Sequence, residues 1–234
     1  MTKSGKEQKE NRWVEKVKSI ILDVDPAEIY QDARDAGLNV AGVEDFRGLG
    51  NQYDRVEELM AQYARKAARY CATSGAAAGF GGPVTAFTLG GMDLANLAAQ
   101  LYWLNQRLAI VNGFDLDAPH QVEQAQEIYL RSLGLDAAAQ ATLKQQILWA
   151  TSLSGKRSAG ASAGPVAKIM LTIARKLSIK LTSKRATRLV PVVGGVFGAG
   201  VNYAFAKSAA ETMIDLFREA YGRAWTTDHN RMIQ

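Results

Sequence analysis

Residues 93 to 111 read Asp93-Leu94-Ala95-Asn96-Leu97-Ala98-Ala99-Gln100-Leu101-Tyr102-Trp103-Leu104-Asn105-Gln106-Arg107-Leu108-Ala109-Ile110-Val111. Apolar and small side chains dominate this stretch, and it contains neither proline nor glycine. A run of this length without apolar and polar alternation favours a helix, because strands are commonly only about four to eight residues long. The stretch therefore predicts one long apolar helix.

Three helices are expected on the N-terminal side of this stretch. The first is amphipathic, the second begins at Pro26 and ends near Gly37, and the third runs from Tyr53 to about Cys71. Proline suits the first turn of a helix, and glycine commonly ends one. The apolar side of the first helix is formed by Trp13, Val14, Val17, Ile20 and Ile21. The third helix has its apolar side at Val56, Leu59, Met60, Tyr63 and Ala67, with Arg55, Arg65, Lys66 and Arg69 outside.

Helical spacing also dominates the C-terminal side. Helices are predicted from about Pro119 to Leu133, from about Asp136 to Leu153, and after Pro165. The helix after Pro165 places its apolar residues within about a 120° arc, at Val166, Ile169, Met170, Ile173, Leu177 and Leu181. Lys168 and Arg175 lie opposite this arc, and Lys176 and Lys180 lie at its margin. A last amphipathic helix carries Met213, Leu216, Phe217, Tyr221 and Trp225.

The fold class predicted from these patterns is all-α, a multi-helix bundle. Two uncharged runs rich in glycine and alanine interrupt it, and they are expected to form two buried helical hairpins. Small residues recur at four-residue spacing in them, a pattern that lets helices approach closely. The glycines that carry this expectation are Gly75, Gly79, Gly82, Gly194 and Gly198. Membrane spanning is the alternative for these runs, but they are short or broken by proline, which favours a protein core.

Composition divides the chain into regions. Residues 1–50 form N-terminal helices that match no recognised pattern, residues 51–226 form one helical domain, and residues 227–234 form a tail. Within the domain, residues 154–164 have the Gly, Ser and Ala content of a flexible linker. The chain is 47% hydrophobic and 22% charged, which excludes a disordered protein. With Cys71 as the only cysteine, no intrachain disulfide can form.

Charge is distributed unevenly along the chain, whose formal net charge is +5. Residues 1–153 contain 15 Lys and Arg against 19 Asp and Glu, a net charge of −4. The remaining residues contain 13 against 4, a net charge of +9, and no acidic residue occurs between Asp136 and Glu211. A segment of one charge sign over this length favours an anionic partner or a solvated basic face.

No catalytic motif is present. Gly155-Lys156 lacks the upstream glycine of a phosphate-binding loop, and no GxSxG motif occurs. Asp117, His120 and Glu123 have some metal-ligand character, together with Asp115 and Glu127. Their order is not HExxH, and acidic residues near a helix start are favoured by the helix dipole. We therefore expect a polar helix start, no metal site and no cofactor.

The basic segment predicts peripheral association with an anionic lipid or membrane surface. The expected contact residues are Lys168, Arg175, Lys176, Lys180, Lys184, Arg185 and Arg188. Nucleic acid is a less favoured partner, because no aromatic residues for base stacking are interleaved with these charges. The polar N-terminus carries no secretory signal, so we expect a cytoplasmic protein at the inner membrane face. A membrane-inserting, toxin-like bundle and a lipid-acting hydrolase with an unrecognised site are the alternatives.

Three ordered stretches of the chain resemble the EcsC protein family. They are Ala64-Arg65-Lys66-Ala67-Ala68 continuing to Gly79, Met92-Asp93-Leu94-Ala95 continuing to Asp117, and Arg188-Leu189-Val190-Pro191 continuing to Asn202. The resemblance covers residues 53 to 225, and it implies a bacterial, mainly helical protein without agreed catalytic residues. The family is of poorly defined function and is named for a gene beside a membrane transporter. A membrane protein complex is the other partner that the acid-free basic segment suggests. Family members often carry Tyr-Gly-Tyr where this chain has Asn112-Gly113-Phe114.

Overall fold

The computed structural model describes residues 15, 19–21, 24–78, 82–152, 159–186 and 196–226, and these form an all-α bundle without strands. Within these ranges, the side chains of 73–93, 151–152, 159–164, 179–186, 196–199 and 226 are not described. The helices are α2 (Pro26–Asp35), α3 (Val43–Arg47), α4 (Tyr53–Ala78), α5 (Gly82–Val111), α6 (Pro119–Ser132), α7 (Ala137–Ser152), α8 (Ala159–Ala186) and α9 (Val196–Tyr221). A short 3-10 turn (Gly50–Gln52) precedes α4, and a π-helical turn (Gly222–Thr226) follows α9.

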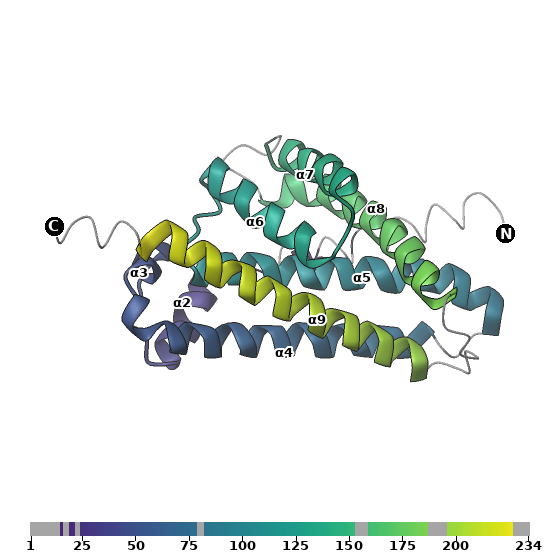
Figure 1. Ribbon diagram of the computed structural model, residues 1–234, viewed down its shortest axis with the longest axis horizontal. Helices are drawn as coiled ribbons and strands as arrows, with labels where there is room; N and C mark the ends of the chain where they lie inside the picture. Colours follow the sequence, from purple (N-terminus) through teal and green to yellow (C-terminus); the bar gives the residue numbers. More distant parts are fainter. Residues whose placement is uncertain are drawn as a thin grey trace.

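The helix predicted over residues 93–111 lies at the centre of the bundle, as part of α5. It packs against α4 and α9 on one side and against α6 and α8 on the other (Figure 1). From Leu94 to Val111 it buries side chains around nearly its whole circumference. An α-helix that is apolar all round is stable only inside a protein or a membrane, so this sequence requires neighbours on every side.

Most predicted helix boundaries are confirmed within a few residues. Helix α2 begins at Pro26, where the Asp25 carboxylate accepts a hydrogen bond of 2.9 Å from the backbone N–H of Ala27. Helices α6 and α7 coincide with the predicted helices to within about two residues. Helix α4, however, continues to Ala78 rather than ending near Cys71. Alanine is the best helix former, so the Gly/Ala run prolongs the helix despite its glycines.

The glycine-rich runs are described only in part. Gly75 lies in α4, Gly82 is the first residue of α5, and Gly198 lies in α9. Gly79 and Gly194 lie outside the described residues. The structure therefore shows the helices that flank these runs, whereas their burial as paired hairpins stays a prediction. No helix in the part of the chain that the structure describes is long and apolar enough to cross a bilayer.

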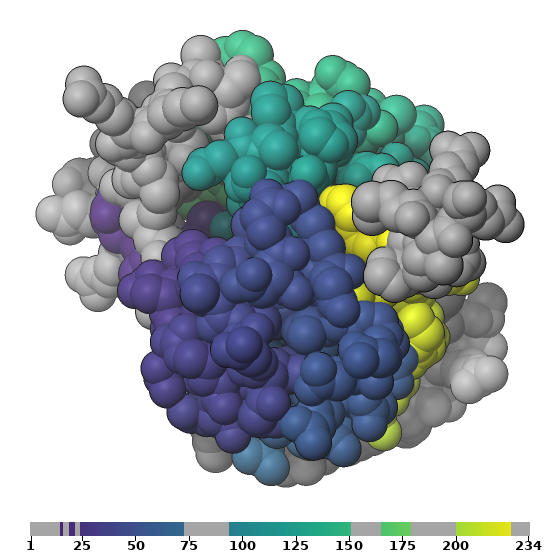
Figure 2. Space-filling view, turned by 90° about the vertical axis from the view of Figure 1, so that its left-hand side faces the viewer, coloured from purple at the N-terminus to yellow at the C-terminus, as the bar shows by residue number. Residues whose placement is uncertain are grey.

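Residues from the N-terminal region contribute to the same hydrophobic core as the rest of the chain. Ile29 in α2 and Phe46 in α3 are fully buried in it. Viewed from the end of the bundle, these N-terminal helices cover the start of α4, below α6 and α7 (Figure 2). Helix α8 begins at Ala159, inside the stretch predicted as a linker over 154–164, of which 154–158 lie outside the described residues. The tail at 227–234 also lies outside them.

The joint after α5 connects distant parts of the chain. The Arg47 Nε donates to the Gly113 carbonyl oxygen at 2.9 Å, and the Tyr53 hydroxyl donates to the Asn112 Oδ1 at 2.7 Å. Gly113 has a φ of +78°, a left-handed conformation that favours glycine. The stretch Asn112-Gly113-Phe114, where the chain departs from the residues common in the family it resembles, thus has a structural role, since it anchors α3 and α4 to the end of α5.

Candidate functional site

Helix α8 turns its apolar arc inward, as predicted. It packs against α5 and α7, and the buried residues of the predicted arc are Val166, Ile169, Met170, Ile173 and Leu177. Lys168 and Arg175 are exposed on the opposite side, and Lys176 at the margin is half-buried. The described part of the apolar stripe is consequently occupied by core packing, which leaves the cationic side facing solvent.

The remaining predicted contact residues are described less fully. Lys180, Lys184 and Arg185 belong to α8, but their side chains lie outside the described residues, as does the whole of Arg188. Helix α8 contains six Lys or Arg residues and no Asp or Glu. Charge compensation inside this helix is therefore impossible, and any neutralisation must come from another element, from solvent ions or from a partner.

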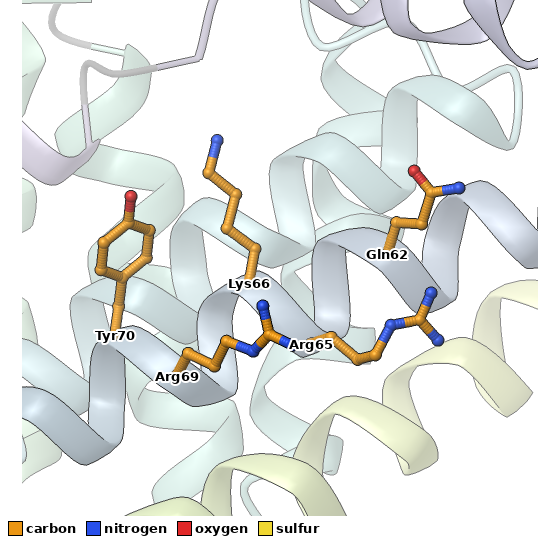
Figure 3. Close-up of a pocket in the computed structure, with 5 residues that line it drawn as sticks. All are labelled: Gln62, Arg65, Lys66, Arg69 and Tyr70. Carbon is orange, nitrogen blue, oxygen red and sulfur yellow. The ribbon is translucent and has the colours of Figure 1, made fainter.

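A second basic surface lies on α4, and sequence reasoning did not identify it as a site. It is a hollow of about 490 Å³ lined by Gln62, Arg65, Lys66, Arg69 and Tyr70. All five side chains are exposed. Gln62, Lys66 and Tyr70 rise from the same side of the helix, while Arg65 and Arg69 extend along it (Figure 3). Residues three, four, seven and eight apart share one helix face, so this regular spacing alone brings the five side chains together.

No carboxylate among the described residues forms an ion pair with Arg65, Lys66 or Arg69. The sequence explains part of this, because it contains no Asp or Glu between Glu58 and Asp93. The first turns of α4 are acidic instead, with Asp54, Glu57 and Glu58. The positive charges that line the hollow therefore lie near the middle of α4, beyond its acidic first turns.

A smaller hollow of about 220 Å³ adjoins the first and shares Lys66 and Tyr70 with it. Its other lining residues are Ile20, Gln100 and Trp103. The Lys66 Nζ lies 5.5 Å from the centroid of the Trp103 ring, within the range of a cation–π interaction. The Trp103 side chain is only 3% exposed, so it lies at the floor of the second hollow with little of its ring accessible.

Behind the Trp103 ring lies an ion pair in which the arginine is buried and the carboxylates are partly exposed. Arg107 in α5 is 1% exposed, and its guanidinium donates to Glu28 at 2.6 Å and lies 3.5 Å from the Asp32 carboxylate. The guanidinium also lies over the rings of Trp103 at 4.5 Å and Tyr63 at 5.1 Å. These contacts join α2, α4 and α5, so they hold the Trp103 ring in place.

The Tyr63 hydroxyl completes this cluster by donating to the Asp32 carboxylate at 2.7 Å. Burial and the hydrogen bond to Asp32 raise the pKa of the Tyr63 hydroxyl well above its ordinary value. The hydroxyl is therefore a permanent donor at physiological pH, and its role in the cluster is structural.

The acidic and histidine residues near the start of α6 are not brought together. Asp117, His120 and Glu123 are all exposed, and the Asp115 Oδ1 accepts a hydrogen bond of 2.8 Å from the Asp117 backbone N–H. In the described ranges, no group of three or more His, Cys, Asp or Glu residues could hold a metal ion.

Two of these acidic residues contribute to an ion pair instead. The Lys144 Nζ in α7 lies 3.1 Å from Glu123 and 3.7 Å from Glu127 in α6. The hydrogen bond to Glu123 raises the pKa of the Lys144 ammonium. This arrangement links α6 to α7 on the surface of the bundle.

Cys71 is fully buried on the inner side of α4. Desolvation raises the pKa of its thiol to about 12. Because the thiolate is the nucleophilic form, a thiol that stays protonated near neutral pH is unsuited to nucleophilic catalysis.

Comparison with known proteins gives one match. The model of the EcsC protein family matches residues 6–220, which includes the N-terminal helices as well as the region from residue 53 onward. No curated protein and no solved structure matches the chain.

Proposed function

We propose that this chain, which belongs to the EcsC protein family, binds peripherally to an anionic membrane surface through the outer face of α8. The outer face is defined here by Lys168, Arg175 and Lys176, with Lys180, Lys184 and Arg185 continuing the same helix. The membrane is the inner face of the cytoplasmic membrane, and a membrane protein complex embedded there is a compatible partner.

One observation carries this proposal. The described apolar side of α8 is buried against α5 and α7, while Lys168 and Arg175 are exposed on a helix that has no acidic residue. An amphipathic helix packed in this way presents a cationic ridge to solvent without needing to unfold. Binding then occurs by electrostatic attraction, and insertion of the apolar stripe is not required.

The expected strength follows from the number of charges. Each Lys or Arg close to an acidic bilayer contributes about 1 kcal/mol, so the two exposed residues Lys168 and Arg175 together contribute about 2 kcal/mol at low salt, and other basic residues of the same helix that reach the bilayer add to this. This attraction falls off within a Debye length of about 8 Å at physiological ionic strength. Association is therefore reversible and sensitive to salt, which is typical of a peripheral protein.

Vesicle flotation tests the proposal with the full-length protein. We expect the protein to float with phosphatidylglycerol vesicles at low salt, to be released as the salt concentration rises, and to stay unbound with neutral phosphatidylcholine vesicles. Failure to float with the anionic vesicles at low salt would contradict the proposal. A dye enclosed in the vesicles should stay inside, because the protein binds the surface without inserting.

A further inference from the structure

We infer that the hollow on α4 is a binding site for a phosphate monoester attached to an apolar or aromatic group. The site consists of Gln62, Arg65, Lys66, Arg69 and Tyr70, with Trp103 in the adjoining hollow. It lies on a different helix from the α8 face, and it recognises one discrete ligand rather than a charged surface. The inference therefore goes beyond the proposed function.

The charge of the hollow selects for an anion. Arg65, Lys66 and Arg69 bring three positive charges to one helix face, and no described carboxylate pairs with them. A phosphate monoester carries a charge of about −1.5 to −2 near neutral pH and has three strong acceptor oxygens, whereas a phosphodiester carries a single charge. Three neighbouring cations thus match a monoester better than a diester.

The arrangement of donors fits the shape of such a group. Arg65 and Arg69 are one helical turn apart, and each guanidinium can donate two parallel hydrogen bonds to phosphate oxygens. The Lys66 ammonium rises beside them, with the Gln62 amide and the Tyr70 hydroxyl at the two ends of the hollow (Figure 3). Its volume of about 490 Å³ is within the range of small-molecule sites, about 300 to 1,000 Å³.

The adjoining hollow defines the second part of the ligand. It shares Lys66 and Tyr70 with the first hollow, and its other lining residues are Ile20, Gln100 and the edge of Trp103. The Trp103 ring is fixed between Lys66 at 5.5 Å and Arg107 at 4.5 Å. The Tyr70 ring is 49% exposed and lines both hollows, so it supplies the aromatic surface of the site. Such a surface beside a cationic hollow is suited to a ligand whose phosphate is joined to a ring or to an acyl chain.

Two sources could supply this chemistry, a lipid with a terminal phosphate or a soluble aromatic phosphate. Calorimetric titration with phenyl phosphate and with inorganic phosphate tests the site itself. We expect phenyl phosphate to bind more tightly than inorganic phosphate, and the preference to fall in Tyr70→Ala. Flotation on phosphatidic acid vesicles, compared with phosphatidylglycerol vesicles of equal surface charge, then identifies the source. Stronger flotation on phosphatidic acid than on phosphatidylglycerol vesicles indicates that the ligand is the lipid. Equal flotation on the two kinds of vesicle, together with binding of phenyl phosphate in the titration, indicates that it is the soluble phosphate.

Matched variants separate this site from the α8 face. R65Q/R69Q should weaken phenyl phosphate binding by about a hundredfold, since each charge-assisted contact changes a binding constant by about tenfold. K168E/R175E should leave the titration unchanged while it weakens flotation on phosphatidylglycerol vesicles. Continued protection of Cys71 from thiol reagents shows that α4 is still packed in each variant. The inference is overturned if phenyl phosphate gives no titration, or if R65Q/R69Q binds it as tightly as the unmodified chain.

Discussion

The indole Nε1 of Trp225 donates a hydrogen bond to the carbonyl oxygen of Asn112, 2.9 Å away and 113 residues earlier in the chain. The Trp225 ring also lies under the Arg47 guanidinium at 4.6 Å and beside the Phe114 ring at 6.1 Å. Three segments that are far apart in sequence meet here: the end of α3, the joint after α5 and the turn after α9. The C-terminal turn consequently closes the bundle over the end of its central helix.

Gly113 occupies a position at this junction where a side chain is unfavourable. Its φ is +78°, and an added Cβ would lie 2.6 Å from the Arg47 Cγ. We expect Gly113→Ala to lower the free energy of unfolding by about 1 to 3 kcal/mol, because it combines an unfavourable backbone conformation with a steric clash. Denaturant unfolding followed by circular dichroism measures this loss.

Gly200→Ala is the matched control for that experiment. Gly200 lies within α9, is exposed, and has no atom within 4 Å of an added Cβ. Alanine at such a position should stabilise the protein by about 0.5 to 1 kcal/mol. Equal unfolding free energies for the two variants would contradict the structure of the joint after α5.

Removing the two sides of the Arg107 ion pair should cost different amounts of stability. Arg107 is 1% exposed, whereas the side chains of Glu28 and Asp32 are 48% and 37% exposed. E28Q/D32N leaves a buried guanidinium without a counter-charge, at an expected cost of about 3 to 5 kcal/mol. Arg107→Met should cost less, about 1 to 2 kcal/mol, because the remaining carboxylates can be hydrated and mainly the cation–π contacts are lost.

Chemical denaturation of both variants checks this order. A larger loss of stability for Arg107→Met than for E28Q/D32N would show that Arg107 contributes through packing rather than through charge. It would also remove the argument that the buried ion pair fixes the Trp103 ring.

Cys71 is a built-in reporter of α4 packing, because it is the only cysteine in the chain and is fully buried. In native buffer we expect its reaction with a thiol reagent to be slower than in the unfolded chain by on the order of a thousandfold or more, since reaction requires opening of the core. Labelling followed by mass spectrometry measures both rates. Native labelling at the unfolded rate would contradict the burial of this helix face.

The raised pKa of the same thiol makes the stability of the folded protein fall as the pH rises. Its pKa is about 12 in the folded protein, compared with about 8.5 for an ordinary cysteine. As the pH rises above about 8.5 the unfolded chain loses this proton while the folded chain keeps it, so the folded state loses stability between about pH 8.5 and 12. The contribution is fully present at lower pH. Cys71→Ala should therefore show a shallower loss of stability above pH 9 than the unmodified chain.

The fold was predictable from the sequence wherever local periodicity determines it. The apolar arc from Val166 to Leu177 is buried as predicted, because a helix with apolar residues on one side is stable in water only when that side packs against other helices. The C-terminal end of α4 and the start of α5 were less predictable, since alanine and glycine runs lack an apolar pattern that marks where a helix begins or stops. Burial of the glycine-rich runs remains a prediction.

The α4 hollow was not predictable in the same manner. Arg65, Lys66 and Arg69 were expected on the outside of their helix, but a solvated basic face has the same pattern as a binding site. What distinguishes them is the neighbouring hollow with Trp103 and Ile20, which are distant in sequence and meet α4 only in the folded chain. The absence of acidic residues from 59 to 92 was the available signal.

The most direct test of membrane association through α8 compares two variants of equal charge. K168E/R175E reverses two charges on the outer face of α8, and R131E/K207E reverses two exposed charges on α6 and α9. Flotation on phosphatidylglycerol vesicles at low salt is the measurement. The account predicts that K168E/R175E lowers vesicle affinity by at least about tenfold relative to R131E/K207E, because each charge near the bilayer contributes about 1 kcal/mol. Equal affinities for the two variants would contradict it.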